Sequence, residues 1–527
     1  MTSIPSAAPT TLGELAREAG TTLSGAAAET EVSSVSLDST AVAPGGLFAA
    51  LPGTRVHGAT YAAESAAGAI LTDAEGRAIL EQAGETRPVL VVDDVRAVLG
   101  RVSARVYGQP SQSMKVLGVT GTSGKTTTTY LLEQGLIAAG CQVGLIGTTG
   151  TRIRGRDVPT SLTTPEAPTL QALFAQMLAE GVTHVVMEVS SHALSLGRVD
   201  GTDFDVAGFT NLSQDHLDFH PTMEDYFEAK ARFFDPSSPV RAARSVVCVD
   251  DEWGRRMLDR AGTGYAVGTR GQEGLDCAAS LVDVTPAGSQ HIGLTLAGET
   301  YELTLPLPGA FNVANAALAA AMAHAAGVDV ARFVAGLENA AVPGRMERID
   351  AGQDFVAVVD YAHKPAAVAA ALETLRGQVD GRVGVAIGAG GDRDASKRPL
   401  MGKEAALRAD LVIVTDDNPR TEDPAAIRAA VIDGAVSAGT DAQIREAGSR
   451  ADAIGELVAW ARPGDAVIVV GKGHEVGQIV GTTTHPFDDR EEMRRALERS
   501  GYGGHAVSGQ QGENRGQTHE ASEGQRP

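Results

Sequence analysis

Residues 120–127, with the sequence TGTSGKTT, have the types and the order that bind the phosphates of a nucleotide triphosphate. They stand between an apolar strand predicted at residues 115–121 and a helix that ends at Gly140. In this setting glycines let backbone N–H groups surround phosphate oxygens, a lysine adds positive charge, and a threonine hydroxyl can bind Mg²⁺. The predicted phosphate-binding residues are Gly121, Thr122, Ser123, Gly124, Lys125, Thr126 and Thr127.

This loop is a variant of the general phosphate-binding pattern. The general pattern has a glycine where this chain has Val119, on the N-terminal side of Gly124. The plainer interpretation is a glycine turn that caps a helix, but the strand–turn–helix setting favours phosphate binding. A phosphate loop implies a nucleotide triphosphate and Mg²⁺ without saying how the phosphate is used. Kinase, motor, switch and ligase therefore all stay open.

Three further residues could bind Mg²⁺ or act beside it. Glu188 ends a strand predicted at residues 183–189, where a carboxylate near the phosphate loop can bind the ion directly or through water. His216 stands in the segment TNLSQDHLDFH, and Lys230 lies in the apolar stretch YFEAKARFF. Each has a plainer interpretation: a strand-end carboxylate, a hydrogen-bonded structural histidine, and a lysine whose charged end reaches water. A buried lysine would be costly unless it is paired or modified.

Polar clusters follow four predicted strands in the last third of the chain. The clusters read YAHKP, AGGDRD, DDNPR and GKGHE, and they follow strands predicted at residues 355–360, 382–388, 411–415 and 466–470. Because ligands bind at the carboxyl ends of parallel strands, we expect all four clusters to face one crevice. Arg393 and Arg420 can each bind a carboxylate with two hydrogen bonds, while Asp417 and Glu475 can accept from an ammonium group. The set suits an amino acid with several ionised groups, and with ATP it suggests amide formation.

The elements that must position these residues fall into three units. Residues 1–112 predict a small N-terminal α/β domain, residues 113–343 a central parallel sheet of the phosphate-loop ATPase type, and residues 344–500 a Rossmann-like doubly wound sheet. The predicted fold class is therefore α/β with three domains. The stretch 501–527 is rich in Gly, Gln, Glu and Ser and predicts a disordered tail.

Composition excludes several classes of protein. The chain has 527 residues, of which 43% are hydrophobic and 21% charged, as in globular proteins of about three domains. Its 44 basic and 66 acidic residues give a net charge of −22, which makes nucleic acid a poor partner. The 3 cysteines show neither a disulfide framework nor a metal-ligand spacing. With no signal peptide or membrane span predicted, we expect a cytoplasmic, monomeric protein that acts on small molecules.

Taken together, the motifs resemble those of the Mur ligases of peptidoglycan synthesis. The resemblance covers residues 30 to 495 and is highly specific. DNPR together with GKGHE points to the family member that adds the third amino acid of the muramyl peptide. The motifs that carry the resemblance are TGTSGKTT, LTTPE, MEVSSHAL, TNLSQDHLDFH, YFEAKARFF, PGAFNVANA, VPGRMER, DYAHKP, GGDRD, DNPR and GKGHE.

The resemblance implies an ADP-forming ligase that joins a carboxylate to an amine. ATP phosphorylates the free carboxylate of the D-glutamyl residue, and the amine of meso-2,6-diaminopimelate attacks the acyl phosphate. Carboxylate and amine form a salt at neutral pH, so the oxygen must first become a leaving group. Because two anions must meet, Mg²⁺, Lys125 and backbone donors have to offset charge repulsion. We expect two Mg²⁺ ions, with ATP as co-substrate.

The resemblance also assigns roles to individual residues. Lys125, Lys230, His216 and Glu188 are the expected catalytic residues, and Lys230 is the lysine expected to be carbamylated to N6-carboxylysine. The expected Mg²⁺ ligands or their close neighbours are Thr126, Glu188, His216 and Lys230. Further nucleotide contacts are expected from Asn312 and Arg345. Contacts to the UDP-muramyl dipeptide are expected from Leu37, Ser39, Thr163, Thr164, Ser190 and Arg198. The expected amino-acid pocket consists of Arg393, Asp417, Asn418, Pro419, Arg420, Gly471 and Glu475.

Three alternatives stay open. The added amino acid could be L-lysine, because some bacteria with lysine in the wall could keep the DNPR motif. Arg420 can pair with the extra carboxylate of meso-diaminopimelate, which L-lysine lacks, and this favours diaminopimelate. A folate polyglutamate-type ligase would lack the N-terminal unit and the DNPR cluster. A nucleotide-binding regulatory module without catalysis is the third alternative.

Overall fold

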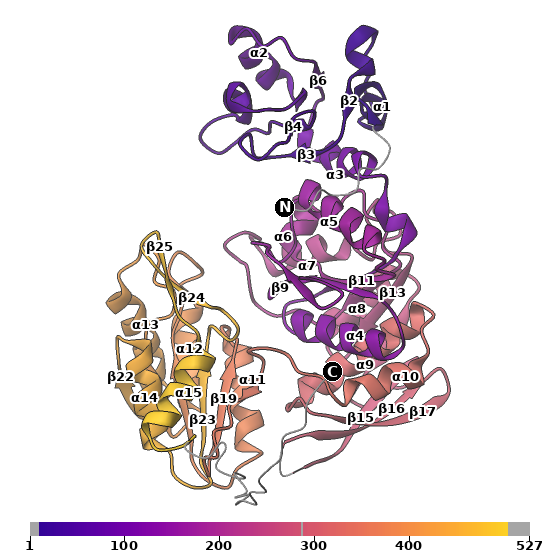
Figure 1. The fold of residues 1–527 in the computed structure, drawn as a ribbon. Helices are drawn as coiled ribbons and strands as arrows, with labels where there is room; N and C mark the ends of the chain where they lie inside the picture. Colours follow the sequence, from indigo (N-terminus) through magenta and orange to yellow (C-terminus); the bar gives the residue numbers. More distant parts are fainter. Residues whose placement is uncertain (1–9, 286–287, 504–527) are drawn as a thin grey trace, which may run out of the picture.

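A computed structural model describes residues 10–285 and 288–503. Its elements form three parts along the chain, each containing one larger sheet (Figure 1). Each sheet lies inside one of the three units expected from the sequence, while the domain boundaries themselves stay a prediction. The tail expected at 501–527 lies outside the described residues from residue 504 onward.

The N-terminal part contains a four-stranded parallel sheet in the order β3-β4-β5-β6. Its apolar core includes Leu12, Leu47 and Leu99. A pair of two-residue strands and 3-10 turns complete this part. Its elements are β1 (Thr10–Thr11), α1 (Leu12–Glu18), β2 (Glu31–Val32), β3 (Val35–Ser36), β4 (Leu47–Ala49), β5 (Ala69–Thr72), α2 (Ala74–Gln82), β6 (Val89–Val91) and α3 (Val95–Val106).

The central sheet has 11 strands in the order β10-β9-β8-β11-β7-β12-β13-β14-β15-β16-β17. The neighbouring strands β8, β11, β7, β12, β13, β14 and β15 are parallel to one another. Antiparallel strands extend the sheet at both edges, β9 and β10 beside β8, and β16 and β17 beside β15. The strands are β7 (Lys115–Thr120), β8 (Val143–Gly147), β9 (Gly150–Ile153), β10 (Arg156–Val158), β11 (His184–Glu188), β12 (Val206–Phe209), β13 (Arg244–Cys248), β14 (Tyr265–Gly268), β15 (Cys277–Val284), β16 (Gln290–Leu296) and β17 (Glu299–Leu305).

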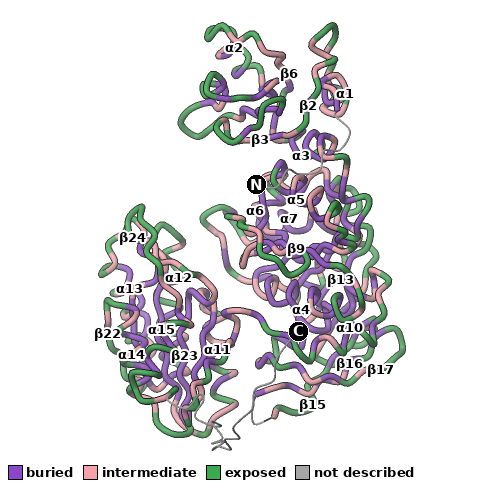
Figure 2. Tube along the Cα trace, in the orientation of Figure 1, coloured by how far each residue is buried: buried purple, intermediate pink, exposed green. Residues whose placement is uncertain are grey.

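Helices cover both faces of the central sheet because successive strand residues point to opposite sides. Leu117 and Val119 pack with α4, α9 and α10, whereas Val116 packs with α5, α7 and α8 on the other face. Strands β7, β11 and β12 are therefore mostly apolar and buried, whereas β15 and β17 toward the edge of the sheet carry many exposed residues (Figure 2). The helices are α4 (Lys125–Ala138), α5 (Ala167–Ala179), α6 (Ser191–Ser195), α7 (Met223–Ala231), α8 (Glu252–Ala261), α9 (Ala310–Ala325) and α10 (Val330–Leu337).

The C-terminal sheet has the order β18-β19-β23-β20-β21-β22, parallel apart from the edge strand β18. Helices α11, α12 and α13 pack on one face and α14 and α15 on the other, which is the expected doubly wound arrangement. The elements are β18 (Glu347–Arg348), β19 (Val356–Asp360), α11 (Pro365–Arg376), β20 (Val383–Ile387), α12 (Lys397–Ala406), β21 (Leu411–Val414), α13 (Pro424–Ser437), β22 (Gln443–Glu446), α14 (Arg450–Trp460), β23 (Ala466–Val470), β24 (Gly477–Val480), β25 (Thr483–Pro486) and α15 (Asp489–Arg499).

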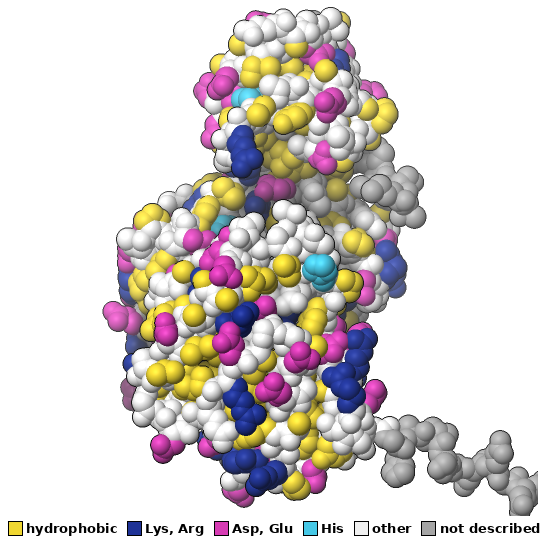
Figure 3. Space-filling model, turned by 90° about the vertical axis from the view of Figure 1, so that its left-hand side faces the viewer, with side chains coloured by type: hydrophobic (Ala, Val, Ile, Leu, Met, Phe, Trp, Pro, Cys, Tyr) yellow, Lys and Arg dark blue, Asp and Glu magenta, His cyan; other side chains and the backbone are white. Residues whose placement is uncertain are grey.

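The three parts are arranged in a bent row, with the N-terminal part at one end and the C-terminal sheet beside the central one (Figure 1). On the face drawn in Figure 3, acidic and basic side chains are interspersed. Within residues 10–285 and 288–503, no helix is long and apolar enough to cross a bilayer.

Candidate active site

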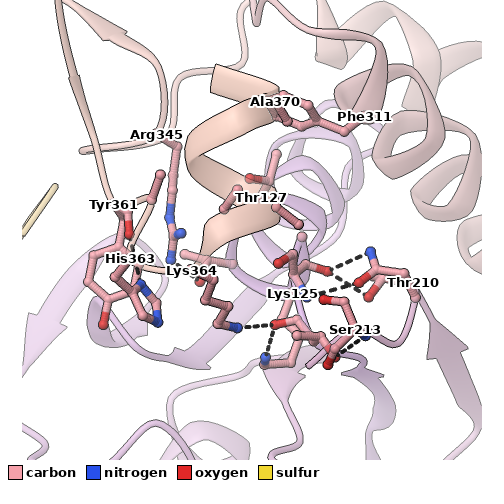
Figure 4. Close-up of a pocket in the computed structure, with 18 of the residues that line it drawn as sticks. Lys125, Thr127, Thr210, Ser213, Phe311, Arg345, Tyr361, His363, Lys364 and Ala370 are labelled. Atoms are coloured by element: carbon pink, nitrogen blue, oxygen red, sulfur yellow. Dashed lines mark hydrogen bonds between the residues drawn. The ribbon is translucent and has the colours of Figure 1, made fainter. Parts of the chain in front are cut away.

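A single cleft of about 1510 Å³ joins the phosphate loop to the C-terminal sheet. The loop after β7 forms one wall, and the loops that follow β19, β20, β21 and β23 form another. The four polar clusters expected from the sequence thus face one crevice, because they leave the same edge of a parallel sheet. Figure 4 shows side chains of both sheets pointing toward each other in this cleft.

The phosphate loop needs its glycines for space as well as for backbone conformation. Gly124 precedes α4 as its N-cap residue with φ +87°, and a Cβ there would lie 2.4 Å from Asn315 Oδ1. Asn315 belongs to α9 and donates to Asn312 Oδ1 of the same helix at 3.0 Å. Lys125 Nζ donates to the carbonyls of Gly121 and Thr122. Burial and the nearby Lys364 charge lower the pKa of Lys125 to about 8.

Glu188 and Thr126 form an oxygen-rich pair beside this lysine. Thr126 Oγ1 donates to Glu188 Oε1 at 3.0 Å, and the backbone N–H of Thr148 donates to the same oxygen at 2.8 Å. Glu188 is buried at the end of β11, as the sequence predicted. A hydroxyl and a carboxylate oxygen are the ligand types that Mg²⁺ prefers. These two residues therefore fit a Mg²⁺ ion that is also bound by nucleotide phosphates.

Asp215 and His216 also line the cleft, near Lys125. His216 Nε2 is 3.1 Å from Asp215 Oδ2, and Lys364 Nζ is 2.7 Å from the same oxygen. Burial lowers the pKa of His216 to about 3, so its ring is neutral and free to act as a ligand. Burial alone would raise the pKa of Asp215, but the Lys364 charge and its hydrogen bond hold this pKa below its ordinary value. Sequence reasoning assigned a role to His216 but missed those of Asp215 and Lys364.

Lys230 lies behind the phosphate loop and does not line the cleft. Its side chain is 1% exposed, and Nζ donates to the Gly121 carbonyl at 3.0 Å. Nζ also lies 4.6 Å from the centre of the Tyr226 ring. Among the described residues, no carboxylate comes within ion-pair distance of Lys230. Burial, together with the Lys125 and Lys364 charges, lowers the pKa of Lys230 well below its ordinary value.

Arg345 brings the start of the C-terminal part to the phosphate loop. Its Nη2 donates to Thr126 Oγ1 at 3.0 Å, and its guanidinium lies 4.3 Å from the centre of the Tyr361 ring. Gly344 precedes it with φ +62°, and a Cβ there would lie 2.1 Å from the backbone nitrogen of His474. The crossing, by which we mean residues 343–345 between the central and the C-terminal sheet, is therefore packed tightly against the GKGHE loop.

The expected amino-acid pocket is organised by a lysine that sequence reasoning did not single out. Lys472 is 0% exposed, and its Nζ lies 2.9 Å from Asn418 Oδ1, 3.1 Å from Glu475 Oε2 and 3.5 Å from Asp417 Oδ1. Asn418 Nδ2 also donates to Glu475 Oε2. The two carboxylates expected to receive a substrate ammonium thus already share Lys472. The only sequence signal for it was its place inside GKGHE.

The hairpin β24–β25 braces the DNPR loop, and sequence reasoning missed it. Gln478 Nε2 donates to the Asp417 carbonyl, and the backbone of Arg420 pairs with Ile479. Arg420 has φ +53°, a conformation that costs energy outside glycine. Its Nη1 donates to the Gly391 carbonyl at 2.7 Å, and Nη2 has no partner among the described residues. Arg420 therefore keeps donors available for a carboxylate in the cleft.

Four of the predicted dipeptide contacts line the cleft: Thr163, Thr164, Ser190 and Arg198. Thr164 Oγ1 donates to the Glu188 carbonyl at 2.8 Å and accepts from the backbone N–H of Ser190. Arg198 Nε lies 2.8 Å from Glu166 Oε1, so its charge is partly neutralised. Most predicted site residues line the cleft. The residues that do not are Leu37, Ser39, Gly121, Lys230 and Pro419; Leu37 and Ser39 belong to the N-terminal part.

Comparison with known proteins gives a consistent result along the chain. Residues 31–107 match the Mur ligase family, catalytic domain; residues 119–323 match the Mur ligase middle domain; residues 344–473 match the Mur ligase, glutamate ligase domain. A curated protein of Corynebacterium glutamicum is 62% identical over 90% of this chain and 93% of its own length. One of Streptomyces coelicolor is 46% identical over 93% of this chain and 97% of its own length. Both are named UDP-N-acetylmuramoyl-L-alanyl-D-glutamate–2,6-diaminopimelate ligase.

Solved structures agree on the fold. A structure of UDP-N-acetylmuramoyl-L-alanyl-D-glutamate–2,6-diaminopimelate ligase has a TM-score of 0.66 and 32% identity, covering 94% of this chain and all of its own. A Mycobacterium tuberculosis folylpolyglutamate synthase structure, at 21% identity and a TM-score of 0.56, covers 70% of this chain and 91% of its own. The chain belongs to the Mur ligase family. The predicted family and fold class are confirmed.

Proposed function

We propose that the protein is an ATP-dependent, ADP-forming ligase that adds meso-2,6-diaminopimelate to UDP-N-acetylmuramoyl-L-alanyl-D-glutamate in peptidoglycan synthesis. The observation that carries the proposal is the single cleft in which a phosphate loop faces four polar strand-end loops. The 62% identity to a curated ligase of this name supports the same reaction and amino acid. A regulatory module without catalysis would not need an amino-acid pocket opposite the phosphate loop.

The chain's residues would divide the reaction into two steps. Lys125 and the loop N–H groups hold the terminal phosphate of ATP while the glutamyl carboxylate oxygen attacks it and ADP leaves. The amine nitrogen then attacks the acyl carbon, loses a proton, and expels inorganic phosphate as the amide forms. Arg345, through its contact with Thr126, would orient the hydroxyl at the phosphates. The attraction between the phosphates and the positive charges of Lys125 and Arg345 is strengthened in this cleft, because little water screens it.

The Mg²⁺ sites are part of this proposal. Thr126 and Glu188 would hold one ion, and His216 with a modified Lys230 a second. When bound, Mg²⁺ supplies positive charge that offsets repulsion between the phosphates and the acceptor carboxylate. The neutral ring of His216 supports a role as ligand.

Carbamylation of Lys230 is proposed on the geometry of its surroundings. A buried ammonium with carbonyl, hydroxyl and aromatic neighbours is costly, and it stands close to two other lysines. A neutral amine can add to CO₂, forming an N–C bond and releasing one proton. The product is an anion that supplies oxygen ligands and removes the excess positive charge.

The pocket supports diaminopimelate over L-lysine. Arg420 and Arg393 both line the cleft, and a free guanidinium edge suits the second carboxylate of diaminopimelate. The domain boundaries at 112, 343 and 500, a monomeric state and a cytoplasmic location complete the proposal. Light scattering of the purified chain would test the monomer.

Amino-acid-dependent release of phosphate tests the proposed reaction. The purified protein is incubated with ATP, Mg²⁺ and the UDP-muramyl dipeptide, with meso-diaminopimelate or L-lysine added in turn. We expect phosphate and tripeptide product only when the dipeptide and diaminopimelate are both present. Turnover with L-lysine alone would overturn the amino-acid assignment. Release of phosphate without either co-substrate would overturn the ligase assignment.

A further inference from the structure

Lys364 belongs to the C-terminal part, and its side chain reaches the phosphate loop of the central part. It follows β19 in the segment YAHKP and forms the N-terminal cap position of α11. The residue is 7% exposed, although most lysines keep their charge in water. Its Nζ donates to the Thr122 carbonyl at 3.1 Å and lies 2.7 Å from Asp215 Oδ2. A lysine of the C-terminal sheet is thus buried in the nucleotide wall of the cleft.

The position of this ammonium group points to a phosphate ligand. Lys125 Nζ donates to the same Thr122 carbonyl at 3.2 Å, so the two ammonium groups converge on one oxygen (Figure 4). The phosphate-loop lysine reaches the β- and γ-phosphates of a bound triphosphate. Lys364, the second cation, lies beside Lys125 and is therefore close to where the terminal phosphate of a triphosphate adds negative charge.

The local charge balance supports the same ligand. Lys364 is buried and Lys125 is half-buried at this loop, and Asp215 and Glu188 are the nearby carboxylates. With Lys125 and Lys364 both charged, two ammonium groups meet at the Thr122 carbonyl in a region that excludes much of the water. An anion between the lysines relieves their mutual repulsion.

We propose that Lys364 binds the terminal phosphate of ATP beside Lys125, and that the C-terminal sheet thereby distinguishes ATP from ADP. Without nucleotide, Asp215 and the Thr122 carbonyl hold the ammonium group in place. With ATP bound, the terminal phosphate becomes its additional partner. The inference rests on the ATP-dependent part of the proposed function and does not depend on which amino acid is added.

Nucleotide binding to the full chain tests this proposal without requiring turnover. Calorimetric titration would compare ADP with adenylyl imidodiphosphate, a triphosphate analogue that is not hydrolysed, each with Mg²⁺. We expect Lys364→Met to weaken binding of the triphosphate analogue about tenfold or more and binding of ADP less than about threefold. Lys364→Arg keeps the charge and should retain most of the discrimination. Lys403→Met is the matched control, because it removes an exposed lysine of α12 outside the cleft.

Three outcomes would overturn the proposal. Equal weakening of both nucleotides would mean that Lys364 only supports the fold of the loop. Unchanged affinities would mean that it serves another group, such as the acceptor carboxylate. A folded Lys364→Met protein that still prefers the triphosphate analogue over ADP as strongly as the wild type would also overturn the proposal. If Lys364→Met does not fold, the comparison is made with Lys364→Arg. Failure of the proposed ligase reaction is distinguishable, because it leaves wild-type nucleotide binding intact.

Discussion

The fully buried Lys472 donates from Nζ to Asn418 Oδ1 at 2.9 Å. This contact fixes the orientation of the Asn418 amide, because its oxygen also accepts from the backbone of Ile479. The amide nitrogen must then face Glu475, to which it donates at 3.0 Å. One lysine thus sets the directions of two side chains of the proposed amino-acid pocket.

Replacing Lys472 should impair amino-acid binding more than nucleotide binding. Lys472→Met leaves Asp417 and Glu475 without their shared cation, so the two carboxylates repel each other and the pocket loses its shape. We expect the KM for the amino acid to rise about tenfold or more, with the KM for ATP changed less than about twofold. Steady-state kinetics with each substrate varied in turn measures the split, with Lys403→Met as control. An equal rise in both KM values would contradict the positioning role.

Replacing Lys230 should abolish most activity in a way that small acids repair. Lys230→Ala removes the carbamate oxygens but leaves a space behind the phosphate loop that acetate or formate can enter. We expect a loss of about 100-fold or more in kcat, with partial recovery as either acid is added. The wild-type protein should also lose activity in buffer stripped of CO₂ and regain it with bicarbonate. Wild-type rates in the unsupplemented variant would refute the role of Lys230.

Binding of Mg-ADP at pH 8 should take up protons. The pKa of Lys125 is lowered from 10.5 to about 8, so in the free protein about half of the molecules carry a neutral amine at this pH. Phosphate favours the charged amine, which raises its pKa and draws a proton from solution. Uptake should shrink toward pH 6.5, where Lys125 is already charged. Calorimetry in two buffers of different ionisation enthalpy measures it, and net proton release at pH 8 would contradict the expected sign.

Replacing Arg450 should destabilise the C-terminal part strongly. Arg450 and Asp489 form a fully buried ion pair at 2.7 Å, and Arg450 Nη2 also donates to the Val470 carbonyl. Arg450→Ala leaves Asp489 as an unpaired buried charge, which costs about 3–5 kcal/mol. The exposed Arg445 provides the control, because Arg445→Ala should cost less than about 0.5 kcal/mol. Urea unfolding of both variants compares them, and equal midpoints would show that the pair contributes nothing.

The sequence predicted those strands that are short and apolar throughout. β7, β11, β19 and β23 lie within or beside their expected ranges because both of their faces are covered by helices. The edge strand β22, with the sequence QIRE, escaped prediction because three of its four residues are polar and exposed. The hairpin β24–β25 escaped for the same reason. Short-range patterns reveal a strand only when burial makes its residues uniformly apolar.

The sequence predicted those site residues that belong to a local motif. It did not predict contacts between site residues that are far apart in the sequence. The phosphate loop and the DNPR cluster could be recognised from adjacent residues alone. The contact of Lys364 with Asp215 joins residues about 150 positions apart and depends on how two sheets meet. No local pattern encodes such a distance. Lys472 was hidden differently, because a lysine in a loop is ordinarily exposed, whereas this one is buried.

The tight packing at Gly344 has a consequence for how the protein tolerates change. A side chain at this position would collide with the backbone of Gly473 and His474, so the chain crossing and the GKGHE loop fit together without spare room. Residues 343–345 therefore cannot act as a loose tether that could be lengthened or replaced at will. Any rotation of the C-terminal sheet must carry the loop and the crossing together. Insertions here should be among the least tolerated in the whole chain, even though the segment belongs to neither sheet.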